Sequence, residues 1–108
     1  MTFAEKLAAF AELAVKIGVN VQPGQYLLIN TTTDTLEFTR EVVKKAYEAG
    51  AGRVHVNLTD AVFERAFFEN TTVEELEKFP KWIVAQREEL IERNGALLWI
   101  DAADPDLL

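Results

Sequence analysis

Three short apolar runs alternate with amphipathic helical segments, and this alternation restricts the folds open to the chain. The runs are Tyr26–Asn30, Arg53–Leu58 and Ala96–Ile100. The first is almost continuously apolar, which is typical of a strand covered on both faces. Because helical segments separate the runs, crossover connections must join the strands, and such connections give parallel pairing. The sequence therefore predicts a three-stranded parallel sheet with helices on both faces.

Helix start and stop signals bracket the segments between these runs. Thr2 with Glu5, and Asp34 with Glu37, have the spacing of capping boxes, in which side chains satisfy free backbone amides at a helix start. We expect further helix starts at Asp60, Thr72 and Pro80, and helix ends at Gly18, Gly50 and Asn94-Gly95. In the first helix, steps of three and four predict one buried apolar face, formed by Phe3, Leu7, Phe10, Leu13, Ala14 and Ile17.

The predicted fold class is α/β, with residues 1–108 as a single α/β domain. A chain of 108 residues lies in the usual size range of one domain. Three strands are few for a doubly wound domain, which commonly has about five or six. The segment Asp104-Pro105-Asp106 follows the last strand and resembles a loop that leads onward. We therefore expect a partial doubly wound domain, either truncated or one domain of a longer protein.

Charge and residue usage exclude several classes of function. A net charge of −7 opposes binding to nucleic acid or to an anionic membrane surface, because both require clustered Lys and Arg. The absence of Cys excludes disulfide bonds, Cys-ligated zinc and a thiol nucleophile. The first residues carry charges where a signal peptide needs an apolar run, so we expect a cytoplasmic location.

Polar side chains follow each predicted strand at its carboxyl end, the edge where open parallel sheets bind ligands. Two interpretations stay open: these residues form a binding surface for a small ligand, or they cap helices and solvate loops. The carboxylates among them could also hold a hard cation. The residues are Asn30, Thr31, Thr32, Thr33 and Asp34 after the first strand, Asn57, Thr59 and Asp60 after the second, and Asp101 and Asp104 after the third.

Other residues with chemical potential favour structural roles. Gly50-Ala51-Gly52 joins a helix to a strand, whereas a phosphate-binding loop joins a strand to a helix, so we interpret it as a helix cap and turn. His55 is the only histidine and lies in the middle of a predicted strand, where a structural role is favoured over general-base catalysis. Trp82 and Trp99 are expected in the core rather than as a stacking platform.

The order and spacing of several segments resemble a known family of enzymes. The chain is similar to metal-dependent aminopeptidases of the aminopeptidase S and aminopeptidase T (thermophilic aminopeptidase) type, and the likeness covers the whole chain. The segments that carry it are Phe3–Leu7, Ala11–Gln25, Val43–Ala51, Val54–Val56, Glu74–Leu76, Phe79-Pro80, Trp82 and Asp104–Leu108.

The resemblance implies a cytoplasmic exopeptidase that uses two divalent metal ions to release N-terminal residues from peptides. In that family the metal ligands are Glu, His and Asp side chains in the later part of a much longer chain, and none maps onto this sequence. We therefore assign no catalytic, cofactor-binding or metal-binding residue here, and expect no bound metal and no activity from this chain alone. The resemblance also implies a homodimeric full-length enzyme, in which this part packs beside the catalytic domain as its non-catalytic N-terminal domain.

Two alternatives remain beside this interpretation. The chain could be a stand-alone small α/β domain that binds a ligand at the polar strand ends, or an interaction domain.

A fragment that lacks its neighbour would also expose apolar side chains. We therefore expect weak self-association through Phe67, Phe68, Trp99 and the Leu107-Leu108 pair, opposed by the charge of −7.

Overall fold

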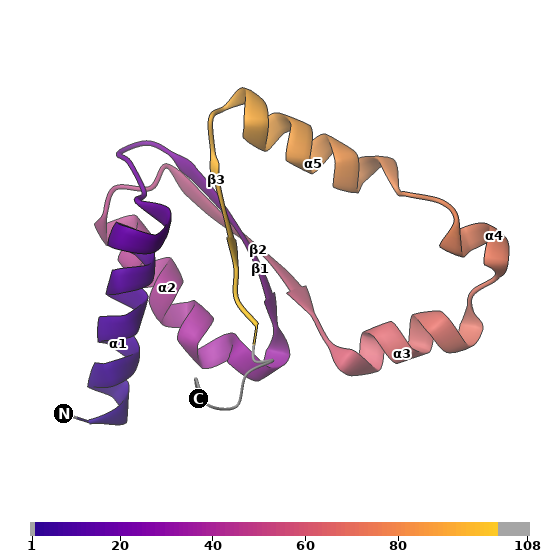
Figure 1. Ribbon diagram of the computed structural model, residues 1–108, viewed down its shortest axis with the longest axis horizontal. Helices are drawn as coiled ribbons and strands as arrows, with labels where there is room; N and C mark the ends of the chain where they lie inside the picture. Colours follow the sequence, from indigo (N-terminus) through magenta and orange to yellow (C-terminus); the bar gives the residue numbers. More distant parts are fainter. Residues whose placement is uncertain (1, 102–108) are drawn as a thin grey trace.

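The structure is a computed structural model that describes residues 2–101, which form one open sheet with helices around it (Figure 1). All three strands are parallel, in the order β2-β1-β3. The predicted α/β class and parallel pairing are confirmed, and the predicted strands differ from the observed ones only at their ends. The elements are α1 (Phe3–Leu13), η1 (Ala14–Val19), β1 (Tyr26–Thr32), η2 (Thr33–Thr35), α2 (Leu36–Glu48), β2 (Arg53–Thr59), α3 (Ala61–Asn70), α4 (Val73–Leu76), α5 (Lys81–Glu92) and β3 (Ala96–Trp99).

The buried core lies on one face of the sheet. The register pairs Leu27 with Val54 and Ile29 with Val56, and alternation along the strands places these side chains on the same face. That face packs against α1, η1 and α2. Leu27 and Ile29 are almost fully buried, so β1 is the centre of the domain. The core cluster comprises Ala11, Val15, Val21, Leu27, Ile29, Val42, Ala46 and Ile100.

The opposite face of the sheet meets α5 through a few long side chains. The guanidinium carbon of Arg93 lies 4.6 Å from the centre of the Tyr26 ring, and that of Arg87 lies 5.6 Å from the centre of a Trp99 ring. Gln86 on α5 exchanges hydrogen bonds with Asn57 on β2. The sheet therefore has helices on both faces, as predicted, although α5 covers its face far less completely than α1 and α2 cover theirs.

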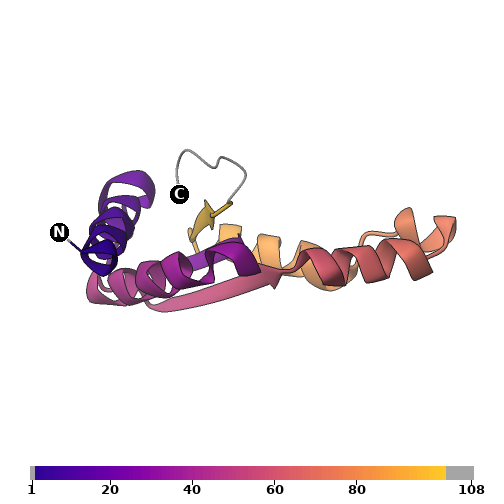
Figure 2. The ribbon, with the colours of Figure 1, turned by 90° about the horizontal axis from the view of Figure 1, so that it is seen from below.

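Residues 61–92, with α3, α4 and α5, form an arm that extends away from the sheet (Figures 1 and 2). In the described part of the chain, no residue of these three helices is buried. The molecule measures 48 × 35 × 17 Å, and its radius of gyration is 15.8 Å. A compact domain of this length would have a radius of about 13 Å. The extended shape thus comes from an arm that has little to pack against.

The buried face of the first helix differs from the predicted one. Phe10 and Ile17 are exposed by 61% and 74%, whereas Ala11 and Val15 are fully buried. Small side chains let α1 approach α2 closely, and the large apolar side chains point outward. The helix also ends differently: α1 continues into the π-helical segment η1, and Asn20 with φ of 57° ends it instead of Gly18.

Most of the predicted helix signals are confirmed. The side chains of Thr2, Asp60 and Thr72 accept hydrogen bonds from backbone amides at the starts of α1, α3 and α4. Asp34 does not cap α2, because it lies inside the 3₁₀ turn η2 and Thr35 takes the position before α2. Pro80 immediately precedes α5.

Both tryptophans lie at the surface, so the prediction that they belong to the core was wrong. Trp82 is 75% exposed and Trp99 is 65% exposed. Their spacing identified an apolar helix and an apolar strand correctly, but in the described residues no further element covers these side chains.

Among the described helices, none combines the length and the apolar character that a membrane crossing requires.

Candidate functional site

The carboxyl ends of β1 and β2 carry a small amide network. Asn30 and Asn57 are register partners on neighbouring strands. The Asn57 Nδ2 donates to Asn30 Oδ1 at 3.1 Å and to Gln86 Oε1 at 2.8 Å, and Gln86 Nε2 donates back to Asn57 Oδ1 at 3.3 Å. This network ties α5 to the sheet. The Asn30 Nδ2 is buried without a partner among the described residues, as is the Thr32 Oγ1.

Three buried threonine hydroxyls join the end of β1 to η2 and α2. Thr31 Oγ1 lies 2.7 Å from Thr35 Oγ1 and 2.9 Å from Thr39 Oγ1. Thr35 and Thr39 in turn donate to the backbone carbonyls of Thr32 and Thr35. All three side chains are almost fully buried. They therefore hold a strand-helix junction together rather than offering groups to a ligand.

Asp60 connects the ends of β1 and β2 and begins α3. Its carboxylate accepts from the Thr33 hydroxyl at 2.9 Å and from the Val62 amide at 2.8 Å. These hydrogen bonds, that of Thr33 above all, hold the pKa of Asp60 below its ordinary value of 3.8. Asp60 is therefore a helix cap, and its two carboxylate oxygens already have partners.

A hard-cation site, which the strand-end carboxylates left open as an alternative, is not assembled by the described residues. Asp60 is engaged as a cap, Asp34 lies in η2, and Asp101 is exposed beyond β3. Asp104 lies outside the described residues. Across residues 2–101, no three His, Asp or Glu side chains converge on a point where an ion could bind. A pair of catalytic metal ions, each held by several protein ligands, does not fit this part of the chain.

An open cavity of about 230 Å³ lies between α5 and the sheet. Arg53 and His55 line it from β2, Tyr26 from β1, and Gln86 and Arg93 from α5. His55 is exposed rather than packed, and Glu89 on α5 lines the same cavity. No hydrogen bond or ion pair joins these two side chains among the described residues, so His55 has no bound carboxylate partner there. The cavity lies beside the Tyr26–Arg53 end of the sheet, opposite the strand-end polar residues.

A second hollow, of about 370 Å³, is predominantly apolar and lies where β2 meets α3. We call it the α3 groove. Leu58 and Thr59 contribute from β2, Asp60 from the turn, and α3 contributes the rest. The α3 residues that line it are Phe63, Glu64, Phe67 and Phe68.

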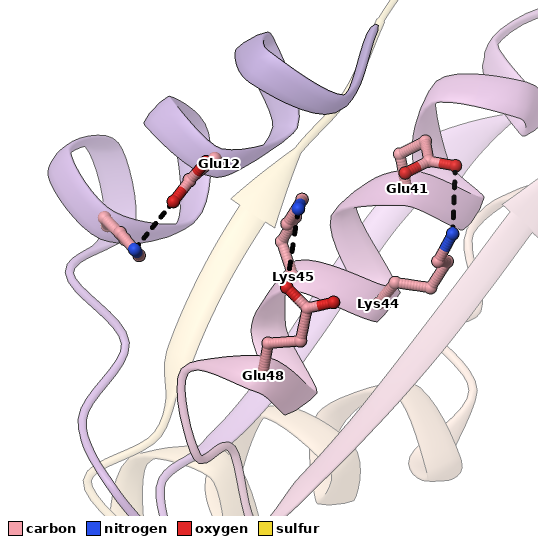
Figure 3. Close-up of polar contacts among 6 residues, drawn as sticks. Glu12, Glu41, Lys44, Lys45 and Glu48 are labelled. Carbon is pink, nitrogen blue, oxygen red and sulfur yellow. Dashed lines mark hydrogen bonds and ion pairs between the residues drawn. The ribbon is translucent and has the colours of Figure 1, made fainter. Parts of the chain in front are cut away.

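Charged side chains on α1, η1 and α2 form local ion pairs (Figure 3). Lys16 Nζ donates to Glu12 Oε1 at 2.7 Å, which lowers the pKa of Glu12 and raises that of Lys16. Lys45 pairs with Glu48 at 3.4 Å. Its charge also attracts Glu12 from the neighbouring helix. These surface pairs link residues three or four positions apart on the helices and do not form a reaction site.

Sequence reasoning missed the partners that complete the polar strand ends. Gln86 reaches Asn57 from α5, 29 residues away, and no periodic pattern marks such a pair. Thr39 sits on the buried side of α2, where its spacing from Val42 and Ala46 could have indicated burial but not a hydroxyl partner. The arrangement that results is mainly structural, because most of these amides and hydroxyls bond to one another, while Asn30 Nδ2 and Thr32 Oγ1 stay without a partner among the described residues.

Comparisons with known proteins identify the family. The chain matches the family described as thermophilic metalloprotease (M29) over residues 3–108. It is 42% identical over 107 residues to the protein "Aminopeptidase AmpS" of Bacillus subtilis, covering 99% of this chain and 26% of that protein. It is 28% identical over 106 residues to "Aminopeptidase T" of Thermus aquaticus, covering 98% and 26%.

A solved structure supports the same relationship. Wild-type AmpT from Thermus thermophilus superposes with a TM-score of 0.84 at 28% identity, covering 97% of this chain and 26% of that one. The chain thus spans about a quarter of the length of the relatives it matches. Because the family match extends over nearly every residue, the chain belongs to the thermophilic metalloprotease (M29) family.

Proposed function

We propose that this chain is the N-terminal, non-catalytic domain of a metal-dependent aminopeptidase that releases N-terminal residues from peptides. The observation that carries the proposal is the extent of the match. Nearly the whole chain matches proteins named as aminopeptidases, yet it corresponds to 26% of their length. The metal-binding catalytic part would then lie in the remainder of the polypeptide.

The arrangement of side chains in residues 2–101 supports the proposal that catalysis belongs to the remainder of the polypeptide and not to this domain. Two metal ions in an aminopeptidase activate a water molecule and polarise the scissile carbonyl, which requires several converging ligands. At the described strand ends, the Asp60 carboxylate caps a helix and accepts from Thr33, and the Asn57 amide bonds to Asn30. These groups are therefore not arranged as metal ligands. We propose further that the full-length enzyme is a cytoplasmic homodimer that acts on peptides, and that this domain walls part of the substrate space.

The test compares this chain with a chimera. In the chimera, the 108 residues replace the matched quarter of the Bacillus subtilis protein. Hydrolysis of aminoacyl-p-nitroanilides is measured with added cobalt, zinc, manganese or magnesium. We expect turnover by the chimera that a chelator abolishes, and no turnover by the chain alone, because residues 2–101 bring no three potential metal ligands together.

Two results would contradict the proposal. Chelator-sensitive turnover that co-purifies with the isolated chain would place the active site within these residues. A folded chimera without activity, beside an active parent enzyme, would show that this chain does not serve as the corresponding domain.

A second candidate function is binding of a small ligand by a stand-alone domain. The observation that favours it is the pair of buried, unpartnered polar atoms at the strand ends, Asn30 Nδ2 and Thr32 Oγ1. A ligand with a carbonyl or carboxylate oxygen would satisfy the amide. Glycylglycine is a suitable probe, and specific binding would raise the melting temperature of the chain but not that of an Asn30→Leu variant. An equal response from both proteins would contradict this function.

A further inference from the structure

We propose that the arm, residues 61–92, is a docking element whose apolar face is covered by the remainder of the same M29 polypeptide. The inference rests on the proposed function, because it requires that this chain be part of a longer one. It goes beyond that function by assigning the surface through which the two parts of the polypeptide meet, and the chemistry of the surface that covers it.

The arm carries an unusual density of exposed large apolar side chains. Phe63 and Phe68 on α3 are 67% and 66% exposed, and Phe79 and Trp82 near the start of α5 are 71% and 75% exposed. Helices that stay at the surface of a finished protein turn an apolar stripe toward a core. Here the stripe has nothing to cover it within the described residues. The exposed large apolar residues of the arm are Val62, Phe63, Phe67, Phe68, Val73, Leu76, Phe79, Trp82, Val84 and Ile91.

The α3 groove gives this surface an anchor point. Phe67 and Phe68 pack edge to face with ring centres 5.6 Å apart. Together with Leu58 and Phe63 they line the hollow of about 370 Å³. A volume of that size admits one or two apolar side chains from a covering surface, and central apolar pockets of this kind dominate the affinity of interfaces. Asp60 and Glu64 stand among the residues around it.

Charge distinguishes between the occupants that could cover the arm. The arm holds eight glutamates against four lysines and arginines, and the whole chain carries a charge of −7. A second copy of the chain would bring an equally acidic molecule to the same surface, and the like charges would repel. The surface that fits the arm is therefore apolar at its centre and basic at its rim, and a second copy of this acidic chain does not meet that description.

The amount of uncovered surface agrees with a missing neighbour. The chain exposes 7990 Å², whereas a compact monomer of 12.2 kDa would expose roughly 6,100 Å². The difference exceeds the ~800 Å² that each partner buries in an interface of standard size. The relatives are about four times as long as the chain, so their remaining length is ample to cover such an area.

Hydroxyl-radical footprinting tests the proposal without any substitution. The chimera with the Bacillus subtilis protein and the isolated 108-residue chain are oxidised in parallel, and the rates at individual side chains are read by mass spectrometry. We expect Phe63, Phe67 and Trp82 to oxidise roughly tenfold more slowly in the chimera, because docking buries them. Tyr47 on α2 is the internal control, and its rate should be the same in both proteins.

A matched pair of variants provides a second measurement. Phe3 and Phe63 are exposed to the same degree, 66% and 67%, but only Phe63 belongs to the arm. We expect Phe63→Gln to lower the melting temperature of the chimera and Phe3→Gln to leave it unchanged. In the isolated chain, neither change should shift the melting temperature, because both side chains are exposed there.

The outcomes separate this inference from the proposed function. An active chimera whose arm oxidises as fast as that of the isolated chain would overturn the docking surface and leave the function intact. Slow oxidation of the arm in an inactive chimera would support docking while counting against the function. Equal protection of the arm in a dimer that the isolated chain forms at low salt, where we expect a monomer, would identify a second copy as the occupant and overturn the proposal.

Discussion

The hydroxyl groups of the three buried threonines have fewer protons to donate than they have close polar contacts. Four close contacts link Thr31, Thr35 and Thr39 to one another and to two backbone carbonyls, but three hydroxyls supply only three protons. When Thr35 and Thr39 give their protons to the carbonyls, Thr31 has one proton, which it can donate to only one of its two neighbours at a time. The geometry therefore assigns Thr31 a single donated bond.

Replacing Thr31 by valine should destabilise the protein only modestly. The change keeps the shape of the side chain, removes one hydrogen bond and leaves the donors of Thr35 and Thr39 satisfied. We expect the free energy of unfolding to fall by about 1 kcal/mol in urea denaturation. Thr71→Val is the control, because Thr71 makes only a long 3.5 Å contact with the Thr72 carbonyl. A loss above about 3 kcal/mol would contradict the single-bond assignment.

Asp60 should titrate below its ordinary pKa, because Thr33 and the Val62 amide stabilise the charged form. A depressed pKa in the folded state adds stability that is present above the unfolded pKa and is lost as the pH falls through the folded value. Thr33→Val should move the titration midpoint of Asp60 upward toward 3.8. The midpoint is read from the carboxyl carbon resonance. An unchanged midpoint in Thr33→Val would show that this hydroxyl is not the main cause.

At the scale of elements, the two turns at the start of the sheet depend on close backbone contact. The Gly24 amide donates to the Gly50 carbonyl, and the Gly52 amide donates to the Gln25 carbonyl, both at 2.8 Å. Gly24 and Gly50 have positive φ angles of 78° and 99°. The glycines that could have suggested phosphate binding thus serve to dock the α2–β2 turn against the turn before β1.

Gly52→Ala should therefore be costly. A Cβ at this position would lie 2.5 Å from the Gly24 carbonyl oxygen, a backbone atom that cannot move aside. We expect a loss of about 1–3 kcal/mol in unfolding free energy, typical of overpacking. Gly18→Ala is the matched control, since its nearest neighbour would be 4.0 Å away in a helical segment, and it should stabilise the protein by about 0.5–1 kcal/mol. Equal effects of the two changes would contradict this account.

The elements show where sequence reasoning succeeds and where it stops. The continuous apolar run around Leu27 and Ile29 correctly predicted a strand covered on both faces, which is typical of so uniform a run. That this strand is the central one came only from the structure. The face of α1 was mistaken because periodicity finds apolar residues, whereas burial depends on which neighbours exist. Phe10 and Ile17 satisfy the pattern and lie outside, and Ala11 and Val15 lie inside. The Asn57–Gln86 hydrogen bond could not be predicted, because no periodic pattern in the sequence marks this pair.

At the scale of the whole molecule, exposed apolar surface and net charge oppose each other. The predicted self-association through Phe67, Phe68 and Trp99 remains a prediction, and Leu107-Leu108 lies outside the described residues. We expect the isolated chain to be mainly monomeric at low salt and to associate weakly as salt is added. The reason is that screening shortens the reach of the repulsion from about 10 Å at 0.1 M to about 3 Å at 1 M.

Sedimentation velocity at several protein and salt concentrations measures this effect. Replacing both Phe67 and Phe68 by glutamine should reduce the association observed at high salt. A strict monomer at high concentration and high salt would contradict the expectation, as would association that weakens when salt is added.

The strand order β2-β1-β3 has a consequence for how the protein is made. The central strand is synthesised first, and β2 follows soon enough to pair with it before the arm exists. The other edge of β1 stays unpaired until residues 60–95 have left the ribosome, which takes roughly 2–7 s at ordinary translation speed. Throughout that interval the second edge of β1 has no partner strand in the nascent chain. The pairing of β3 with β1 is therefore the last step in forming this three-stranded sheet during synthesis.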